Sequence, residues 1–212
     1  MTGPTRVLLV DDHAVVREGY RRLLEDEPSI HVVGEASNAA QACEQARSIG
    51  PDVVVMDIAL PGVSGIEATR RMLREQPGLR VVMFSMYDDA IYARRALEAG
   101  ALGYLSKACA PEVLVRAIYA VSRGERYVSP DVAANMAQSA ATPGKSEIEA
   151  LTPREFEILR LLVQGETVRS ISEKLTLSEK TVANHQSAIR EKLGARNSAQ
   201  LARLASQLDL SV

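Results

Sequence analysis

The stretch "VVVMDIALPGVSG", residues 53–65, runs four apolar residues into an acid, Asp57, and then into the turn formers Pro61, Gly62 and Gly65. A short run of this composition, bounded by turn residues, is typical of a β-strand that is buried on both faces. Asp57 then stands at the carboxyl end of the strand, where open α/β sheets place their chemistry. The alternative is that Asp57 only caps the following turn. The residues that reach the same edge decide between these two interpretations.

Four further apolar runs repeat this unit along the first half of the chain. Helix-length segments separate the runs, and three of these segments approach their ends through Gly50, Gly78 and Gly100. Strands that alternate with helices form a mostly parallel sheet whose right-handed crossovers cover both faces. The sequence therefore predicts an α/β doubly wound parallel five-stranded sheet. The five strands are expected at residues 6–10, 30–36, 52–57, 79–85 and 101–107.

The composition changes near residue 129. Residues 129–148 are poor in large apolar side chains and rich in Ala, Ser, Thr and Gly, which is typical of a linker whose first part can be helical. The sequence therefore predicts a first domain at 1–128, a linker at 129–148 and a second domain at 149–212.

The second domain begins with a capping box. Thr152 is the expected N-cap, Pro153 the first helical residue, and Glu155 the residue that reaches back to the cap. Glycine and short polar segments divide the rest of the domain into helical stretches, which predicts a small all-α four-helix domain. The four helices are expected at residues 153–164, 168–175, 179–193 and 198–208.

Length and composition limit the class of protein. With 212 residues, of which 46% are hydrophobic, the chain suits two small domains with real cores. No apolar stretch approaches the roughly 18 residues that span a bilayer, and the first residues lack the pattern of a signal peptide. We therefore expect a soluble, cytoplasmic protein with no membrane insertion. The two cysteines, Cys43 and Cys109, show no metal-ligand spacing and are assigned no chemistry.

Several polar residues are expected at the carboxyl edge of the sheet beside Asp57. The first strand ends in "VDDH", which places Asp11 and Asp12 there, while the fourth strand ends at Ser85 and the fifth supplies Lys107. Carboxylates this close raise one another's pKa and destabilise the fold unless a cation is present. Three acids in one pocket therefore indicate a bound metal, and a hard ion held by few protein oxygens is typical of Mg²⁺.

Such an edge is suited to phosphoryl chemistry. A divalent ion, with Lys107 as a point charge, would shield phosphoryl oxygens and let Asp57 attack phosphorus as a nucleophile. The Ser85 hydroxyl can hydrogen-bond a phosphoryl oxygen and move toward it, which vacates space for an aromatic side chain such as Tyr104 and creates a two-state element. Taken alone, Tyr104 is more often a partly buried strand aromatic.

The segments "LLVDDH", "DVVVMDIALPGVSG", "FS" and "GYLSK" resemble the receiver domain of bacterial two-component response regulators, over about residues 5–125. The resemblance implies a flavodoxin-like fold in which Asp57 accepts a phosphoryl group from a sensor histidine kinase. It further implies that Asp12 is a direct Mg²⁺ ligand, that Asp11 is linked to the ion through water, and that the carbonyl of Ala59 completes the metal site. Under the same resemblance, Ser85 and Tyr104 are the switch pair.

The third expected helix of the second domain is amphipathic. At 100° per residue Val182, Ile189 and Leu193 share one face, which predicts that they are core residues, while Asn184 lies on the opposite face. A shorter helix precedes it across the tight connection "TLS", in which Ser178 is the expected N-cap. Two helices joined in this way have helix-turn-helix geometry.

The segments "LTPREFEILRLLVQG" and "SISEKLTLSEKTVANHQSAIREKLGARN" look like a LuxR/FixJ-type DNA-binding domain, over about residues 149–208. Together the two halves resemble full-length NarL/FixJ-class response regulators. The resemblance implies a phosphorylation-controlled, sequence-specific transcription factor that binds double-stranded DNA and is not an enzyme. It also implies that the last helix forms a dimer contact, although ordinary packing inside the bundle is the alternative.

The charge of the second domain is nearly balanced. Residues 149–212 hold nine Lys and Arg against eight Asp and Glu, whereas DNA-binding domains usually carry a basic stripe. Few cationic contacts per subunit favour a homodimer on a two-part site, and we expect phosphorylation to promote it. Asn184 is the best candidate for a base contact, because its amide can pair with adenine. The candidate DNA contacts are Arg169, Lys180, Thr181, Asn184, Ser187, Lys192 and Arg196, although each cation is also plausible as a solvated surface charge.

The sequence leaves three functions from different classes open, and the transcription factor ranks first. The second is a phosphatase that uses Asp57 as its nucleophile. Haloacid-dehalogenase-like phosphatases have a second Asp two residues later as the general acid, and this chain has Ala59 at that position. The third is a signalling adaptor whose helical domain binds protein. Binding of a specific duplex distinguishes the first function from the third.

Overall fold

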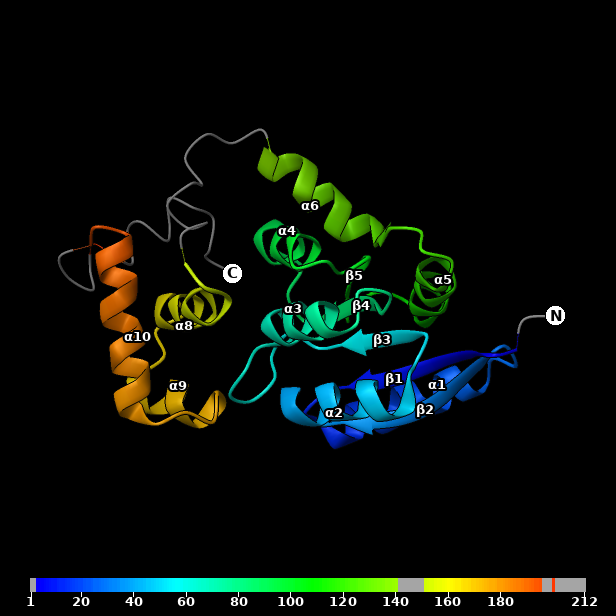
Figure 1. Cartoon of the computed structure of the whole chain (residues 1–212). Coiled ribbons are helices and arrows are strands. Elements are labelled where there is room, and N and C mark those ends of the chain that lie inside the picture. Colours follow the sequence, from blue (N-terminus) through cyan, green and yellow to red (C-terminus); the bar gives the residue numbers. More distant parts are fainter. Residues whose placement is uncertain (1–2, 141–150, 196–199, 201–212) are drawn as a thin grey trace. The chain divides into compact units, whose positions relative to one another are not determined.

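The structure, a computed structural model, describes residues 3–140, 151–195 and 200. The chain divides into two compact units, Met1–Ser139 and Ala140–Val212. Strands and helices alternate in the first unit, while the described part of the second unit is helical (Figure 1).

The first unit contains the five β-α repeats that the apolar runs predict, followed by a short strand and a helix. Its strands are β1 (Thr5–Val10), β2 (Ile30–Ala36), β3 (Val53–Met56), β4 (Arg80–Ser85), β5 (Gly103–Ser106) and β6 (Tyr127–Val128). Its helices are α1 (Ala14–Glu25), α2 (Ala39–Ile49), α3 (Gly65–Glu75), α4 (Ala90–Glu98), α5 (Pro111–Ser122) and α6 (Pro130–Ala140).

All neighbouring strands of the sheet are parallel, in the order β2-β1-β3-β4-β5-β6. This confirms the doubly wound parallel sheet and the five predicted strands. The sixth strand was not predicted, because β6 has only two residues and no apolar run marks it. It pairs with β5 through Gly103 and Tyr127, at the edge of the sheet.

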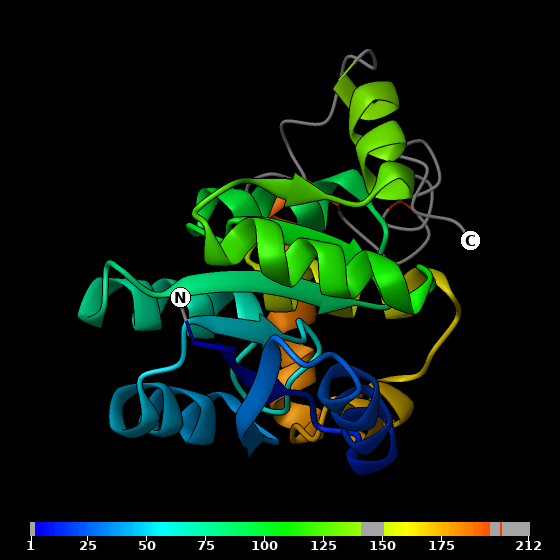
Figure 2. The ribbon, with the colours of Figure 1, turned by 90° about the vertical axis from the view of Figure 1, so that its right-hand side faces the viewer.

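The centre of the sheet is buried on both faces. Every residue of β3 is buried, as the quoted apolar run predicts. Figure 2 shows α1 and α2 on opposite sides of β1 and β2, so these strands have helices on both faces. One core cluster joins β1, β3, β4 and β5 to Leu24 of α1 and to Leu114 and Ile118 of α5. Because the faces are occupied by apolar contacts, polar chemistry is left to the strand ends.

The predicted linker begins with structure of its own. Helix α6 lies within the first unit as far as Ser139, and its residue Val132 is fully buried. The backbone N–H of Ser129, just before α6, donates to the carbonyl of Tyr104 in β5 at 3.1 Å. The remaining linker residues, 141–148, lie outside the described residues.

The second unit contains helices α8 (Pro153–Val163), α9 (Val168–Lys174) and α10 (Glu179–Lys192). The predicted capping box is present at α8, with Thr152 and Glu155 bonded reciprocally. Val182 and Ile189 are fully buried, as the helical spacing predicts. The predicted fourth helix, 198–208, lies outside the described residues except for Gln200, which is helical. None of the helices among the described residues combines the length and the apolar character that a membrane crossing requires.

Among the glycines that the structure describes, Gly65, the first residue of α3, is the one most closely approached by other atoms. A Cβ atom at this position would lie 1.8 Å from the carbonyl oxygen of Asp57, whereas one at Gly19, inside α1, would meet nothing within 4 Å. Gly65 thus permits the chain to pass directly beneath the end of β3.

We predict that Gly65→Ala lowers the free energy of unfolding by about 1–3 kcal/mol or more, because the Asp57 peptide must move. The matched variant Gly19→Ala should raise it by up to ~1 kcal/mol through helix propensity. Urea unfolding of both variants tests this. Equal effects of the two substitutions would contradict the close approach at Gly65.

Candidate functional site

Three charged side chains meet at the carboxyl edge of the sheet. The Lys107 ammonium donates to Asp11 Oδ2 at 2.6 Å and to Asp57 Oδ2 at 2.7 Å. The side chains of Lys107, Asp11 and Asp57 are only 6%, 7% and 4% exposed. The structure therefore brings together three of the residues that the sequence placed at this edge.

The sheet itself positions these residues, because the ladder extends one residue past the ends of three strands. The backbone N–H of Asp57 donates to the carbonyl of Val10 at 2.9 Å, and that of Lys107 donates to the carbonyl of Ser85 at 2.7 Å. The backbone N–H of Asp11 donates to the carbonyl of Ala36 at 3.0 Å. A backbone hydrogen bond thus holds each charged residue in place, in addition to the contacts of its side chain.

Burial and charge act in opposite directions at this site. Burial raises the pKa of Asp57, and the facing Lys107 ammonium only partly opposes this effect. Burial lowers the pKa of Lys107, but Asp57 and Asp11 outweigh it, so that the Lys107 pKa is raised and the ammonium stays charged. An incoming group that carries negative charge would therefore meet a fixed cation.

A cluster of possible metal ligands adjoins these three side chains. Among the described residues, ligand atoms of Asp11, Asp12 and His13 lie within 4.8 Å of one another. His13 Nδ1 is 2.7 Å from Asp12 Oδ1, and the His13 backbone N–H donates to Asp11 Oδ1 at 2.8 Å. Sequence reasoning did not single out His13, although its position directly after two acids in "VDDH" was a usable signal. An acidic pocket of this kind is typical of Mg²⁺ sites.

The Ala59 peptide also lies at the site. Its backbone N–H donates to Asp57 Oδ1 at 3.3 Å, so it orients the carboxylate through the oxygen that is not bonded to Lys107. The role of the Ala59 carbonyl as a metal ligand, like that of Asp12 as the direct ligand, stays a prediction.

The two expected switch residues are both fully buried. The Tyr104 hydroxyl donates to the carbonyl of Tyr87 at 2.6 Å, and the Tyr87 N–H donates to Ser85 Oγ at 3.2 Å. Burial raises the pKa of Tyr104 well above its ordinary value, so its hydroxyl is a stable donor. The Tyr104 ring thus lies in the interior in this structure, and its role as a switch partner of Ser85 stays a prediction.

Tyr87 connects these residues to the rest of the first unit. Its ring stacks on that of Tyr92 in α4, with centroids 4.5 Å apart and planes at 12°. The carbonyl of the next residue, Asp88, accepts a hydrogen bond from the Asn135 side chain of α6 at 3.1 Å. Sequence reasoning missed Tyr87 and Asn135 because these bonds involve backbone carbonyls, which leave no mark in the sequence. The segment that follows Ser85 therefore contacts both α4 and α6.

The second unit exposes most of the predicted DNA contacts on α10. Lys180, Asn184 and Ser187 are exposed, although the Ser187 hydroxyl donates to the Ala183 carbonyl at 3.0 Å. Thr181 is half-buried, and its hydroxyl lies 2.8 Å from that of Ser178, the N-cap of α10.

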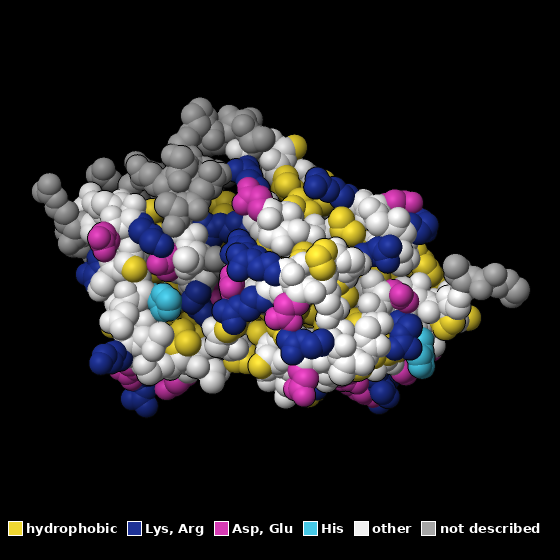
Figure 3. All heavy atoms as spheres, viewed as in Figure 1, with side chains coloured by type: hydrophobic (Ala, Val, Ile, Leu, Met, Phe, Trp, Pro, Cys, Tyr) yellow, Lys and Arg dark blue, Asp and Glu magenta, His cyan; other side chains and the backbone are white. Residues whose placement is uncertain are grey.

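The remaining predicted cations differ in their surroundings. Arg169 pairs with Glu173 of its own helix at 3.2 Å and is largely exposed. Lys192 pairs with Glu155 of α8 at 2.6 Å. Arg196 lies outside the described residues. Acidic and basic side chains are interspersed over the described part of the second unit on the face shown in Figure 3, in keeping with its near-neutral charge.

Comparison with known proteins gives a consistent result for both units. The family described as response regulator receiver domain matches residues 7–119, and the family described as bacterial regulatory proteins, luxR family, matches residues 149–205. The chain is 41% identical over 201 residues to Response regulator UvrY of Escherichia coli K12, covering 94% of this chain and 92% of that protein. It is 40% identical over 202 residues to Response regulator GacA of Pseudomonas aeruginosa, covering 94% of each.

A solved structure of full length is also similar. RcsB from Salmonella enterica serovar Typhimurium, bound to a promoter in the presence of the phosphomimetic BeF₃⁻, is 27% identical, has a TM-score of 0.66, and covers 97% of this chain and 100% of that one. The parallel sheet of the first unit and the helices of the second unit agree with these matches. The chain belongs to the two-component response regulators, with a receiver domain followed by a luxR-family regulatory domain.

Proposed function

We propose that Asp57 accepts a phosphoryl group from a sensor histidine kinase, and that the phosphorylated chain binds specific double-stranded DNA as a homodimer in the cytoplasm to regulate transcription. The observation that carries this proposal is the buried Asp57 carboxylate at the end of β3, within 2.7 Å of the Lys107 ammonium. A carboxylate placed beside a buried cation at an open sheet edge is suited to nucleophilic attack on phosphorus.

The transfer step follows from the contacts of Asp57. A carboxylate oxygen of Asp57 attacks the phosphorus of the kinase phosphohistidine, the N–P bond breaks, and the departing imidazole takes up a proton from water. Lys107 then exchanges its bond to Asp57 for one to a phosphoryl oxygen. Asp11, Asp12, Asp57 and the Ala59 carbonyl would hold Mg²⁺, which would neutralise phosphoryl oxygens. We expect the Ser85 hydroxyl, at the end of the neighbouring strand β4, to bond a further oxygen.

Two exposed apolar residues support a protein as the phosphodonor. Val15, in the first turn of α1, is 88% exposed, and Met86, directly after Ser85, is 70% exposed. Both belong to segments that begin at the carboxyl edge of the sheet, next to the acidic site. Exposed apolar residues at the rim of a reactive site favour docking of another protein surface.

The second unit supports DNA as the target. Its exposed α10 residues Lys180 and Asn184 suit contacts with phosphate and adenine. The similar protein RcsB has been solved on a promoter in the presence of BeF₃⁻. Because residues 149–212 carry a net charge of only +1, two copies are needed to supply enough cationic contacts.

The alternatives have less support. A phosphatase that uses Asp57 as nucleophile needs a general acid nearby, and the position two residues later is Ala59. A signalling adaptor would leave the polar face of α10 without a role. We therefore assign the chain no catalytic turnover of its own.

Acetyl phosphate should label the wild-type protein with one phosphoryl group when Mg²⁺ is present, and intact-mass spectrometry measures this. Asp57→Asn should not be labelled, because the nucleophile is lost, whereas Asp131→Asn, which removes an exposed acid of α6, should be labelled like the wild type. Equal labelling of Asp57→Asn and the wild type would refute the site assignment.

Asp12→Ala should remove most of the Mg²⁺ dependence of this labelling, because a direct ligand is lost. Asp11→Ala should weaken the dependence less, since Asp11 is expected to contact the ion through water. Labelling rates measured over a Mg²⁺ titration test both expectations. Identical Mg²⁺ affinities in the wild type and both variants would show that these acids do not bind the ion.

Beryllofluoride should raise both the dimer population and the affinity for a duplex with two half-sites, as sedimentation and fluorescence anisotropy can measure. Asn184→Ala should relax the preference at one base pair by about 1–3 kcal/mol. Lys180→Ala should weaken all duplexes alike, because a phosphate contact carries no sequence information. A beryllofluoride-bound protein that stays monomeric and binds DNA no better than the free form would contradict this mechanism.

A further inference from the structure

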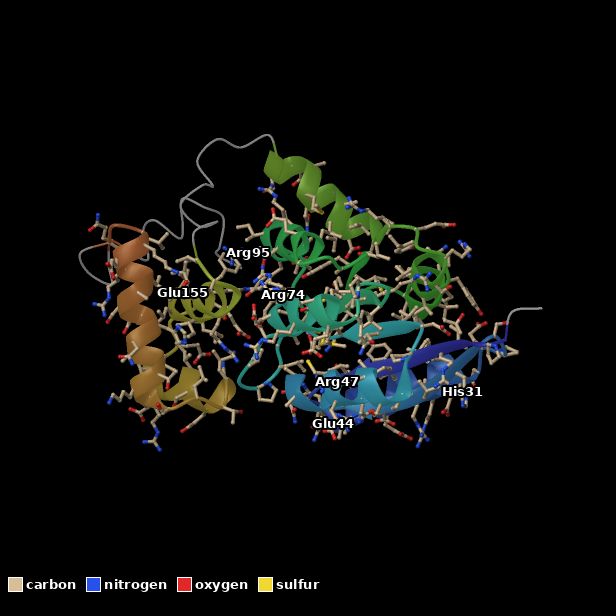
Figure 4. The ribbon with its side chains drawn as sticks, viewed as in Figure 1. His31, Glu44, Arg47, Arg74, Arg95 and Glu155 are labelled. Carbon is tan, nitrogen blue, oxygen red and sulfur yellow. The ribbon has the colours of Figure 1, made fainter. Side chains whose placement is uncertain are left out.

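Glu155 makes two hydrogen bonds that link the ends of two helices. Its Oε2 atom accepts from the backbone N–H of Thr152 at 2.6 Å and from the Lys192 ammonium at 2.6 Å. Glu155 is in the first turn of α8, and Lys192 is the last residue of α10. One carboxylate, labelled in Figure 4, therefore ties the start of α8 to the end of the helix that exposes Asn184.

The two partners are buried to different extents. The Glu155 side chain is 7% exposed and the Lys192 side chain is 35% exposed. Although burial raises the pKa of Glu155, the bonds from Lys192 and Thr152 hold that pKa below its ordinary value, so the carboxylate is charged. Because the Glu155 side chain is buried although that of Lys192 is partly exposed, removing Lys192 leaves a buried carboxylate without a counter-charge, which is unfavourable. If Lys192 turned to a DNA phosphate, the buried Glu155 carboxylate would lose its counter-charge, which lowers the stability of the second unit.

We infer that Lys192 is a positioning residue for DNA recognition and not one of the phosphate contacts. Through its bond to Glu155, Lys192 fixes the rotation of α10 about its own axis and its position along α8. It thereby sets the direction in which Lys180 and Asn184 face DNA. This role replaces the phosphate contact expected for Lys192 from the sequence alone, and it rests on the proposed DNA binding.

The other contacts of α10 leave such a role open. Val182 and Ile189 hold the helix against α8 and α9, but apolar contacts are non-directional and tolerate small rotations. A hydrogen-bonded ion pair at one end has a defined geometry. Asn184 lies eight residues before Lys192, about 12 Å along the helix axis, so a rotation at Lys192 is carried along the rigid helix to the proposed base contact.

Substitution by glutamine separates the ion pair from the cap. Gln in place of Glu155 keeps the capping box, since Gln also serves at this position, but it removes the charge that binds Lys192. The informative set is Glu155→Gln, Lys192→Gln and the double variant, with Lys192→Arg as a conservative rescue. Lys180→Gln is the matched control, because it removes an exposed cation from the same helix.

DNA binding of the full-length protein with beryllofluoride gives the first readout. A duplex selected by the wild type from a random pool is compared with a scrambled duplex over a series of salt concentrations. Glu155→Gln and Lys192→Gln should each lower the ratio of specific to scrambled affinity by about tenfold, with the double variant no worse, since both belong to one ion pair. Neither variant should change the salt slope, that is, the slope of the logarithm of the DNA affinity against the logarithm of the salt concentration. Lys180→Gln should reduce the magnitude of this slope by about 1. Lys192→Arg should restore the ratio of specific to scrambled affinity.

Hydrogen exchange of the free protein gives a readout that does not depend on DNA. Glu155→Gln and Lys192→Gln should speed exchange equally in the last turns of α10, while Lys180→Gln leaves it unchanged. If no duplex is selected, the proposed DNA binding fails, and exchange still decides whether the pair fixes α10. Unchanged exchange in both Gln variants would overturn the inference. It would also be overturned if Lys192→Gln lowered the salt slope as Lys180→Gln does while Glu155→Gln bound like the wild type.

Discussion

The receiver depends on one buried ammonium. Lys107 lies between Asp11 and Asp57, and all three side chains are almost completely excluded from solvent. Two carboxylates this close would repel each other and resist ionisation, so the cation between them is what allows the acidic site to exist inside a folded sheet. Asp11, Asp12 and Asp57 carry three formal negative charges against the one positive charge of Lys107, and a divalent cation can balance this excess of two. The same ammonium that stabilises the free protein is therefore the group that can pair with phosphate.

The contacts around this site form a continuous path to the start of the predicted linker. Ser85 at the end of β4 bonds Tyr87, the Tyr87 carbonyl bonds Tyr104, and the neighbouring Asp88 carbonyl bonds Asn135 of α6. If Ser85 moved toward a phosphoryl group, its hydrogen bond from the Tyr87 N–H would have to lengthen or break. In the second unit Glu155 Oε2 accepts hydrogen bonds both from the Thr152 N–H, as part of the helix cap, and from the Lys192 ammonium. Each unit is thus organised by a buried charge rather than by apolar packing alone.

The sequence predicted the parts of the molecule that repeat or that place charge at strand ends. The run before Asp57 indicated a strand buried on both faces, and "VDDH" with Lys107 indicated the acidic edge, because parallel strands bring their carboxyl ends together. It did not predict β6, which is too short for a periodic signal, or the hydrogen bond of Tyr104, whose acceptor is the backbone carbonyl of Tyr87. Lys192 was visible as a cation, but its partner is 37 residues away, so only the folded unit shows that it is paired.

A crystal structure of the full-length protein with Mg²⁺ and beryllofluoride would test whether Asp57 is the phosphoacceptor and Lys107 its phosphate partner. We predict a beryllium adduct on an Asp57 carboxylate oxygen, with the Lys107 ammonium moved from Asp57 to one fluorine and the Ser85 hydroxyl bonded to another. An adduct at a different residue, or a Lys107 that still bridges Asp11 and Asp57 with no adduct at saturating beryllofluoride, would contradict it.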